Sequence, residues 1–300
     1  IFQQRKLMTH QKLEIKELIS SFQDYLTYEK GLSENTVDAY KSDIIKFTQY
    51  ADLNNLNKNV ISKYFFELSE FNYSNTSKQR MYSSIKQFLK YLNNFGFVDN
   101  FEIENIKFKS ELKLPEVISV SQIDSMINYY NHNSFLNSRN LTIIDFIYST
   151  GSRVSEVINV NISDIDTKES FVRLEGKGSK QRIVPLGSLL VNNLTEYIKL
   201  RDSIENLESS KLFLSKSYKK LDRSAIFRIV KSTALKLGLD VDLHPHTLRH
   251  SAATHMLERG CDLRTVQEFL GHSSVSTTQI YTKVTKEFLE EAFNESHPRS

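Results

Sequence analysis

Strong helix breakers are scarce in this chain, since glycine occurs nine times and proline four times among 300 residues. Because these two residues interrupt helices most effectively, long segments are free to form them. Apolar residues recur at helical spacing from Ile15 to Leu26, and Gly31 follows as a stop signal. The chain is therefore predicted to be mainly α-helical.

Composition excludes several classes of protein. Hydrophobic residues make up 39% and charged residues 25%, which is typical of a globular protein with real cores. No run of about 18 apolar residues is present to span a membrane, and the N-terminus lacks the apolar core of a secretory signal. Cys261 is the single cysteine, so an intrachain disulfide and a cysteine-based metal cluster are excluded. We expect a cytoplasmic protein without a membrane partner.

A change of pattern near residue 104 predicts two domains. Residues 1–103 hold four amphipathic segments, of which the last ends at Gly96. The next stretch, 104–117, carries several lysines without helical periodicity, and Pro115 discourages helix before it. We interpret this stretch as a basic linker, followed by a longer second domain at residues 118–300.

The second domain is predicted to be mixed but mostly helical. A short β-hairpin is expected between about Ser170 and Leu186, with Gly176 and Gly178 in its turn. The expected helices are Ser121–Tyr130, Arg139–Ser149, Leu189–Arg201, Ser224–Leu237, Thr247–Arg259, Asp262–Leu270, Val275–Thr282 and one from Thr285 to about Phe293.

Two glycine-flanked segments carry cations, which matters because the net charge of only +3 does not by itself indicate a nucleic-acid partner. In the first, Arg153 follows Gly151 where one helix leads sharply into the next, and its planar fork can bind an oxyanion. The alternative is an ion pair with Glu156, three residues on. The second segment is the hairpin tip 176–182, which suits phosphate contact or proton donation unless it is an ordinary solvated turn.

The densest segment runs from His244 to His250 and starts a predicted helix. His246 and Arg249 are three residues apart and share one face near the helix N-terminus, which favours anion binding. His246 and His250 also have the spacing of zinc ligands, but the glutamate of the metalloprotease motif and a third ligand are missing. We therefore expect no metal here.

Attack of a tyrosine on a phosphodiester needs a specific set of groups. Cations and a proton acceptor must favour the phenolate, and fixed donors must stabilise the phosphorane. The leaving oxygen needs a proton, which a lysine can deliver. Two Arg, two His, one Lys and one Tyr would suffice without a metal or another cofactor. The motifs above, with His272 and Tyr281, contain such residues.

Together these motifs resemble the tyrosine recombinase (phage-integrase-type) family, and specifically its Xer branch. The resemblance covers roughly residues 14 to 298, with Tyr28–Thr36 similar to the start of the family's core-binding domain and Pro115–Ile127 similar to its linker. Ser152 departs from the pattern, because a larger apolar residue is common there. The family's catalytic residues fall, in the expected order, on Arg153, Lys177, His246, Arg249, His272 and Tyr281.

The resemblance implies a mechanism and an architecture. Tyr281 would attack the scissile phosphate and form a 3′-phosphotyrosyl bond, while His246 assists proton transfer from the tyrosine. Lys177 would protonate the leaving 5′-oxygen, which is thereby released as a 5′-hydroxyl. Three residues would hold the non-bridging oxygens, namely Arg153, Arg249 and His272. A helical N-terminal core-binding domain and a mostly helical catalytic domain with a small β-hairpin would form a clamp around DNA.

The implied partners are a double-stranded recombination site and other recombinase protomers. Strand exchange would pass through a Holliday junction in a homotetramer, or in a heterotetramer with a paralogous recombinase, and a DNA translocase could activate it. Phosphate contacts are expected on the fourth helix and on the hairpin, unless these are ordinary exposed charges. The candidate residues are Lys78, Arg80, Lys86, Lys180 and Arg182.

Several functions are compatible with these residues. The leading hypothesis is resolution of chromosome or plasmid dimers at segregation, favoured by the lack of a further N-terminal DNA-binding domain. The alternatives are a mobile-element integrase, a type IB topoisomerase, a DNA-binding protein without catalysis and a metal-dependent nuclease. The last predicted helix has an apolar stripe that includes Phe288 and Phe293. The stripe could pack on its own core, but the resemblance favours docking in a neighbouring protomer.

Overall fold

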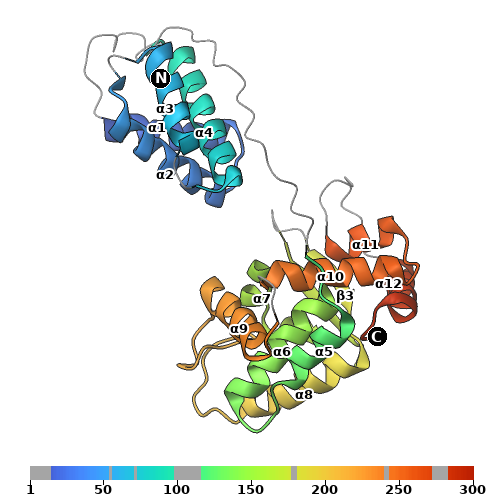
Figure 1. Cartoon of the computed structure of the whole chain (residues 1–300). Helices are drawn as coiled ribbons and strands as arrows, with labels where there is room; N and C mark the ends of the chain where they lie inside the picture. The colour runs from blue at the N-terminus through green and yellow to red at the C-terminus, as the bar shows by residue number, and fades with distance from the viewer. Residues whose placement is uncertain are drawn as a thin grey trace. The chain divides into compact units, whose positions relative to one another are not determined.

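The computed structural model comprises two compact units, Ile1–Lys113 and Leu114–Ser300 (Figure 1). Of the predicted linker 104–117, only residues 116 and 117 are described, so its limits stay a prediction. No helix of the described residues is both long and apolar enough to cross a membrane. The described residues are 15–53, 56–70, 73–97, 116–176, 181–239, 243–271 and 283–300.

The described part of the first unit contains the four expected helices. The first of them continues as a π-helical turn over Tyr25–Glu29, and Gly31 follows it in the left-handed region at φ 61°. Ser74 caps the fourth helix, because its hydroxyl accepts a hydrogen bond from the amide of Ser77. The helices are α1 (Ile15–Asp24), α2 (Glu34–Tyr50), α3 (Lys58–Glu70) and α4 (Asn75–Asn94).

Aromatic rings fill the core of the first unit. Phe22 packs edge-on against Phe88 with ring centroids 5.0 Å apart, and Phe47 packs in the same way against Tyr64 at 5.1 Å. Such edge-to-face pairs add to the free energy of burial itself. Phe22 and Phe47 belong to the apolar faces that the sequence pattern predicts, so the pattern predicts both the helices and the faces that they bury.

The second unit is mostly helical and surrounds α6, whose residues from Ser138 to Thr150 are buried, apart from Asn140. Helices α5, α8 and α10 pack against it (Figure 1). The helices are α5 (Val120–Asn128), α6 (Phe135–Thr150), α7 (Val154–Asn159), α8 (Ser188–Asp202), α9 (Arg223–Lys236), α10 (Pro245–Glu258), α11 (Leu263–Leu270) and α12 (Lys283–Ser296). The predicted helix Val275–Thr282 lies outside the described residues.

A small antiparallel sheet completes the second unit. The predicted hairpin corresponds to β2 (Phe171–Glu175) and β3 (Gln181–Pro185), with Val172 opposite Val184. A third strand, β1 (Ile165–Asp166), pairs with β2. Two residues are too few to show a strand period, so the sequence pattern does not predict β1.

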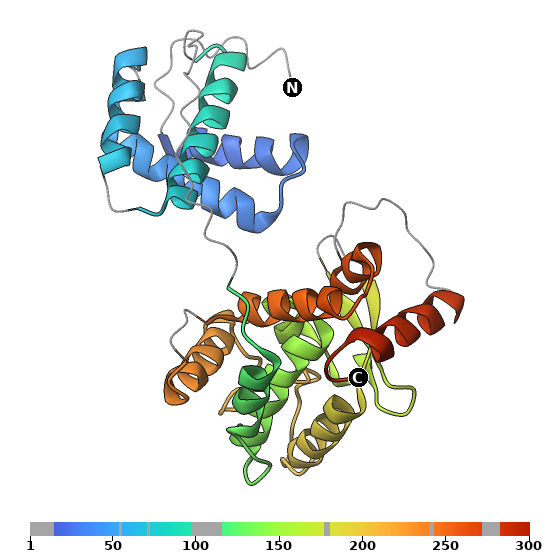
Figure 2. The same cartoon turned by 45° about the vertical axis from the view of Figure 1, so that its right-hand side comes forward.

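Helix α12 packs on its own chain. Leu289 and Phe293 are buried, and the Phe293 ring stacks on His297 with centroids 4.6 Å apart. The helix lies against β3, α10 and α11, as Figure 2 shows for the red helix beside the yellow strands. Leu289 and Phe293 thus follow the alternative in which the stripe packs on its own core, whereas Phe288 is 51% exposed. Docking of the stripe in a neighbouring protomer stays a prediction.

The last residues of the chain are anchored to α6. The guanidinium of Arg299 donates to both carboxylate oxygens of Asp145, at 2.7 and 3.0 Å, and to Asp124 at 2.9 Å. Asp145 has no solvent exposure, and Asn193 donates a further hydrogen bond to it. A β-carbon at Gly187 would lie 1.8 Å from the carbonyl oxygen of Arg299, so this approach requires glycine.

Arg299→Ala should lower the free energy of unfolding of the second unit by about 3 kcal/mol or more, because it leaves Asp145 buried without its cation. Urea unfolding followed by circular dichroism measures this change. Lys199→Ala is the matched control, since the Lys199–Glu196 pair is exposed and exposed pairs contribute little. A loss for Arg299→Ala as small as that of the control would contradict the prediction.

Candidate active site

The first predicted motif lies at a sharp turn between α6 and α7. Gly151 ends α6 in the left-handed region, with φ 55°, and Arg153 is the N-cap residue of α7. A β-carbon at Gly151 would lie 2.7 Å from the ring of Phe269, so both the backbone conformation and the space require glycine. This turn directs Arg153 toward the end of α11.

Arg153 forms the ion pair that the sequence offers as an alternative, and its side chain stays accessible. Its backbone amide donates to Glu156 Oε2 at 2.7 Å, and its Nη1 donates to Oε1 at 2.9 Å, so the ion pair three residues on is present. Its Nη2 donates to the carbonyl of Gly271 at 3.0 Å. The side chain is 32% exposed, which leaves it accessible to an anion.

Arg249 connects α10 to the ends of two other helices. The helix begins at Pro245, two residues before the predicted Thr247, and this start places Arg249 in the second turn. His244 is its N-cap residue. Its guanidinium donates to the carbonyl of Gly151, and to that of Leu270 at 2.8 Å. Both acceptors are backbone oxygens at helix ends, where carbonyl groups lack partners within the helix.

Arg182 lies in the same site, and the expectation that it contacts DNA is wrong. Its side chain is only 5% exposed, and its two terminal nitrogens donate to the two oxygens of Glu156 at 2.6 and 2.9 Å. Its Nε donates to the carbonyl of Phe269 at 3.0 Å. The strand period explains this placement, because Arg182 shares the buried face of β3 with Val184.

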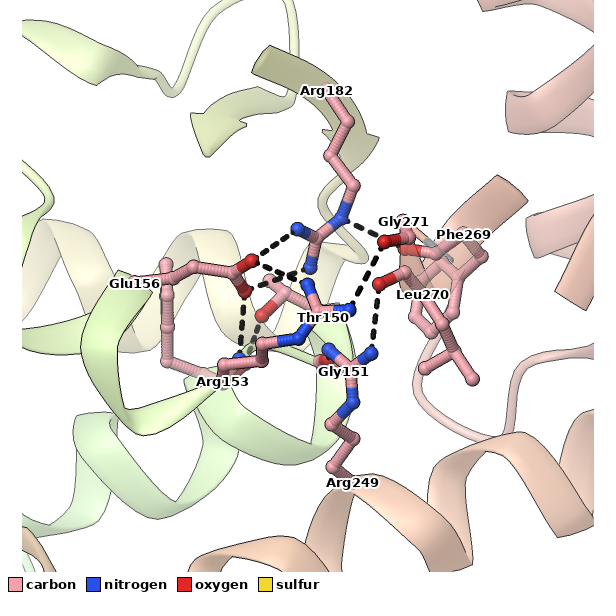
Figure 3. Close-up of polar contacts among 10 residues, drawn as sticks. Thr150, Gly151, Arg153, Glu156, Arg182, Arg249, Phe269, Leu270 and Gly271 are labelled. Atoms are coloured by element: carbon pink, nitrogen blue, oxygen red, sulfur yellow. Dashed lines mark hydrogen bonds and ion pairs between the residues drawn. The ribbon is translucent and has the colours of Figure 1, made fainter. Parts of the chain in front are cut away.

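Three guanidinium groups therefore meet in one site (Figure 3). Arg153 and Arg182 bind the carboxylate of Glu156, and Arg249 lies next to Arg153 on the backbone carbonyls. Burial alone would raise the pKa of Glu156, but hydrogen bonds and charges from Arg182 and then Arg153 outweigh it and lower that pKa, which keeps the carboxylate ionised. Burial first, and then Arg153 and Arg182, lower the pKa of Arg249. The described site carries excess positive charge and suits an anion.

His246 lies beside this cationic cluster in the first turn of α10. Its pKa is lowered by burial first, and then by His244 and Arg249. The imidazole is therefore neutral near neutral pH, and a neutral imidazole can accept a proton. Its ring lies near that of Phe227, with centroids 6.4 Å apart.

The remaining catalytic residues of the sequence prediction lie outside the described residues, as does Lys180. They are Lys177, His272 and Tyr281. The described chain nevertheless reaches the site next to one of them, because the carbonyl of Gly271, which precedes His272, accepts the hydrogen bond from Arg153. The roles of these residues stay predictions.

The predicted DNA contacts on α4 have different surroundings. Lys78 is buried, so a phosphate contact from it does not fit its position. Arg80 is partly exposed and donates to the carboxylate of Asp43 and to the carbonyl of Ala39 at 3.0 Å. Burial raises the pKa of Asp43, while Arg80 opposes that shift. Lys86 is exposed, with its ammonium 5.9 Å from the centroid of the Tyr82 ring.

Comparison with known families identifies the class of protein. Residues 116–287 match the phage integrase family, and residues 19–95 match the phage integrase N-terminal SAM-like domain. The chain therefore belongs to the phage integrase family. It is a site-specific recombinase of the tyrosine type, with a mainly helical fold.

Curated relatives refine this placement. The chain is 38% identical over 293 residues to the tyrosine recombinase XerD of Oceanobacillus iheyensis, which covers 94% of this chain and 98% of the relative. It is 37% identical over 300 residues to the tyrosine recombinase XerD of Bifidobacterium longum, with 94% and 97% covered. The similarity thus runs through both units rather than through one motif.

Solved structures share the fold. The XerH site-specific recombinase bound to a palindromic difH substrate after cleavage superposes with a TM-score of 0.68 at 23% identity, covering 91% of this chain and 83% of that one. A lambda integrase dimer bound to a COC′ core site gives a TM-score of 0.68 at 15% identity, covering 89% and 99%. At these identities the likeness concerns the fold.

We expect His246 to lose its proton below the ordinary value of 6.5, because burial and the neighbouring cations disfavour the imidazolium. Titration of its ring proton by NMR measures this pKa, and the resonance is assigned by its absence from the His246→Gln variant. A midpoint above the ordinary value would contradict the prediction, and with it the proton-accepting role.

Proposed function

We propose that this recombinase resolves chromosome or plasmid dimers at segregation, by cutting and rejoining DNA at a specific double-stranded site. The observation that carries the chemistry is a cluster of three arginines in which, among the described residues, one carboxylate, Glu156, balances Arg153 and Arg182 while Arg249 is held by backbone carbonyls. The biological role is supported by 38% identity to a tyrosine recombinase XerD over nearly the whole chain.

The scissile phosphate would bind between Arg153 and Arg249. Each guanidinium donates one terminal N–H to each of two acceptors, and the other N–H groups of its fork can reach non-bridging oxygens. Arg249 is fixed by backbone carbonyls, so its donors need little reorganisation during the reaction. Such preorganised donors stabilise the extra charge of the pentavalent phosphorane.

Tyr281 would supply the attacking oxygen. Its phenolic proton passes toward neutral His246, the new bond forms between the phenolate oxygen and phosphorus, and the bond to the 5′-oxygen breaks. Lys177 gives a proton to that leaving oxygen. The phosphotyrosyl bond keeps the energy of the phosphodiester, so a 5′-hydroxyl of the partner strand can rejoin without ATP or metal.

Recombination requires more than one protomer. Two rounds of strand exchange through a Holliday junction would take place in a homotetramer, or in a heterotetramer with a paralogous recombinase, and a DNA translocase would start the reaction. The cytoplasm is the expected location, because the substrate is chromosomal or plasmid DNA. The first unit would hold the DNA through Arg80 and Lys86, with Lys180 of the hairpin as a further contact.

Tyr281→Phe should abolish the covalent protein–DNA adduct, because the variant lacks the attacking oxygen. The measurement uses nicked duplexes with candidate recombination sites, incubated with a chelator and separated on a denaturing gel. Tyr218→Phe, an exposed tyrosine of the same unit, is the control and should form the wild-type amount. An adduct that persists in Tyr281→Phe, or that requires a divalent metal, would falsify the mechanism.

Lys86→Ala should weaken DNA binding in a salt-dependent way. If its ammonium neutralises one phosphate, the slope of log affinity against log salt should become shallower by about 0.9. Fluorescence anisotropy over a salt series measures the slope. Lys63→Ala is the control, because this exposed lysine of α3 already pairs with Glu67. Equal slopes for wild type and Lys86→Ala would exclude Lys86 as a phosphate contact.

A further inference from the structure

Arg182 uses its whole fork inside the site. Its two terminal nitrogens bind the two oxygens of Glu156, at 2.6 and 2.9 Å, and its Nε binds the carbonyl of Phe269 at 3.0 Å. The same two carboxylate oxygens accept hydrogen bonds from Arg153, one from its Nη1 and one from its backbone amide. Glu156 is therefore shared between a buried and an accessible arginine.

Because both arginines bind Glu156, the carboxylate neutralises only part of the positive charge of Arg153. Glu156 is needed locally, because its carboxylate satisfies the backbone amide of Arg153 at the start of α7. Without Arg182, the full negative charge of Glu156 would fall on Arg153, the only other cation that binds it in the described residues. Arg182 neutralises that charge from a position only 5% exposed, while Arg153 is 32% exposed.

Arg182 also joins three segments that carry catalytic positions. It belongs to β3, which follows the hairpin tip of Lys177, and through Glu156 it contacts the start of α7. Through Phe269 it contacts the end of α11, from which the chain continues to His272. A β-carbon at Gly271 would lie 2.9 Å from its Cδ, so the glycine provides the space that Arg182 occupies.

We propose that Arg182 is a positioning residue of the recombination reaction: it neutralises Glu156 and thereby keeps the charge of Arg153 directed at the scissile phosphate. This inference rests on the proposed function, since it assumes that Arg153 binds that phosphate. A lysine at this position would retain the charge, but a single ammonium cannot bind both carboxylate oxygens and the Phe269 carbonyl in this geometry.

Arg182→Gln tests the proposal through the rate of adduct formation on nicked duplex at saturating protein. We expect the variant to cleave bound DNA about 100-fold more slowly, as when a fixed transition-state donor is lost. DNA affinity and its salt slope should stay unchanged, because a buried guanidinium neutralises no phosphate. Arg173→Gln, an exposed arginine on the neighbouring strand β2, is the control and should cleave at the wild-type rate.

A second variant separates charge balance from folding. In Glu156→Gln/Arg182→Gln the carboxylate that would bind Arg153 is gone, so the cleavage rate should recover about tenfold or more over Arg182→Gln alone. The double variant also removes an unpaired buried charge and so restores stability. Urea unfolding of both variants therefore accompanies the rates, and the expected result is a recovery of the cleavage rate at equal folded fraction. A double variant as slow as the single one would therefore overturn the proposal.

A substrate with a neutral scissile group provides a further test. The ratio of variant to wild-type rates is compared between two substrates, and the folded fraction of the variant cancels in that comparison. With a methylphosphonate at the scissile position, one non-bridging oxygen is replaced by methyl, so the charge of Arg153 matters less. The deficit of Arg182→Gln against wild type should shrink about tenfold on this substrate relative to ordinary DNA. Equal deficits on both substrates would overturn the proposed role of Arg182 but leave the proposed function standing. The absence of any wild-type adduct on ordinary DNA would contradict the proposed function itself.

Discussion

The geometry of the site depends on one buried carboxylate. Glu156 accepts hydrogen bonds from the backbone amide and guanidinium of Arg153 and from the two terminal nitrogens of Arg182. A lone carboxylate at such a depth would take up a proton, but the two cations keep it ionised. Because these partners come from α7 and β3, the single acid fixes the distance between two parts of the chain. Arg249 then joins the same arrangement through the carbonyls of Gly151 and Leu270.

The rigidity of this arrangement comes from α6. This helix is buried along most of its length, and its end sets the position of Gly151 and thus of Arg153. On its inner side, Asp145 binds Arg299, so the last residues of the chain hold the helix in the core. Among its described residues, the second unit therefore has two buried acids paired with arginine, Glu156 in the cationic site and Asp145 on α6. Each joins segments distant in sequence, which hydrophobic packing alone positions less specifically.

Much of this structure could be predicted from the sequence, for identifiable reasons. The helices of the first unit follow from the spacing of apolar residues, and the segment from His244 to His250 is predicted to start a helix, as α10 confirms. Arg153 and His246 can be recognised as site residues because one follows a glycine between two helices and the other lies at a helix N-terminus. Arg182 is not recognised in this way, because three cations near a hairpin tip look like a solvated turn, although the strand period places Arg182 beside Val184 on the buried face. The position of α12 depends on packing, and a stripe of apolar residues does not specify which core it enters.

The acceptors that hold Arg249 are main-chain oxygens at the ends of α6 and α11. A mutation can remove a side chain but not a backbone carbonyl group. A substitution at position 270 therefore leaves the hydrogen bond from Arg249 intact as long as the backbone keeps its path. The residues that cannot be substituted are instead the glycines. Gly151 and Gly271 both adopt left-handed conformations, and a side chain at either position would clash with its neighbours. The site therefore tolerates side-chain substitutions at the residues whose carbonyls bind Arg249, but not at the glycines where the backbone turns.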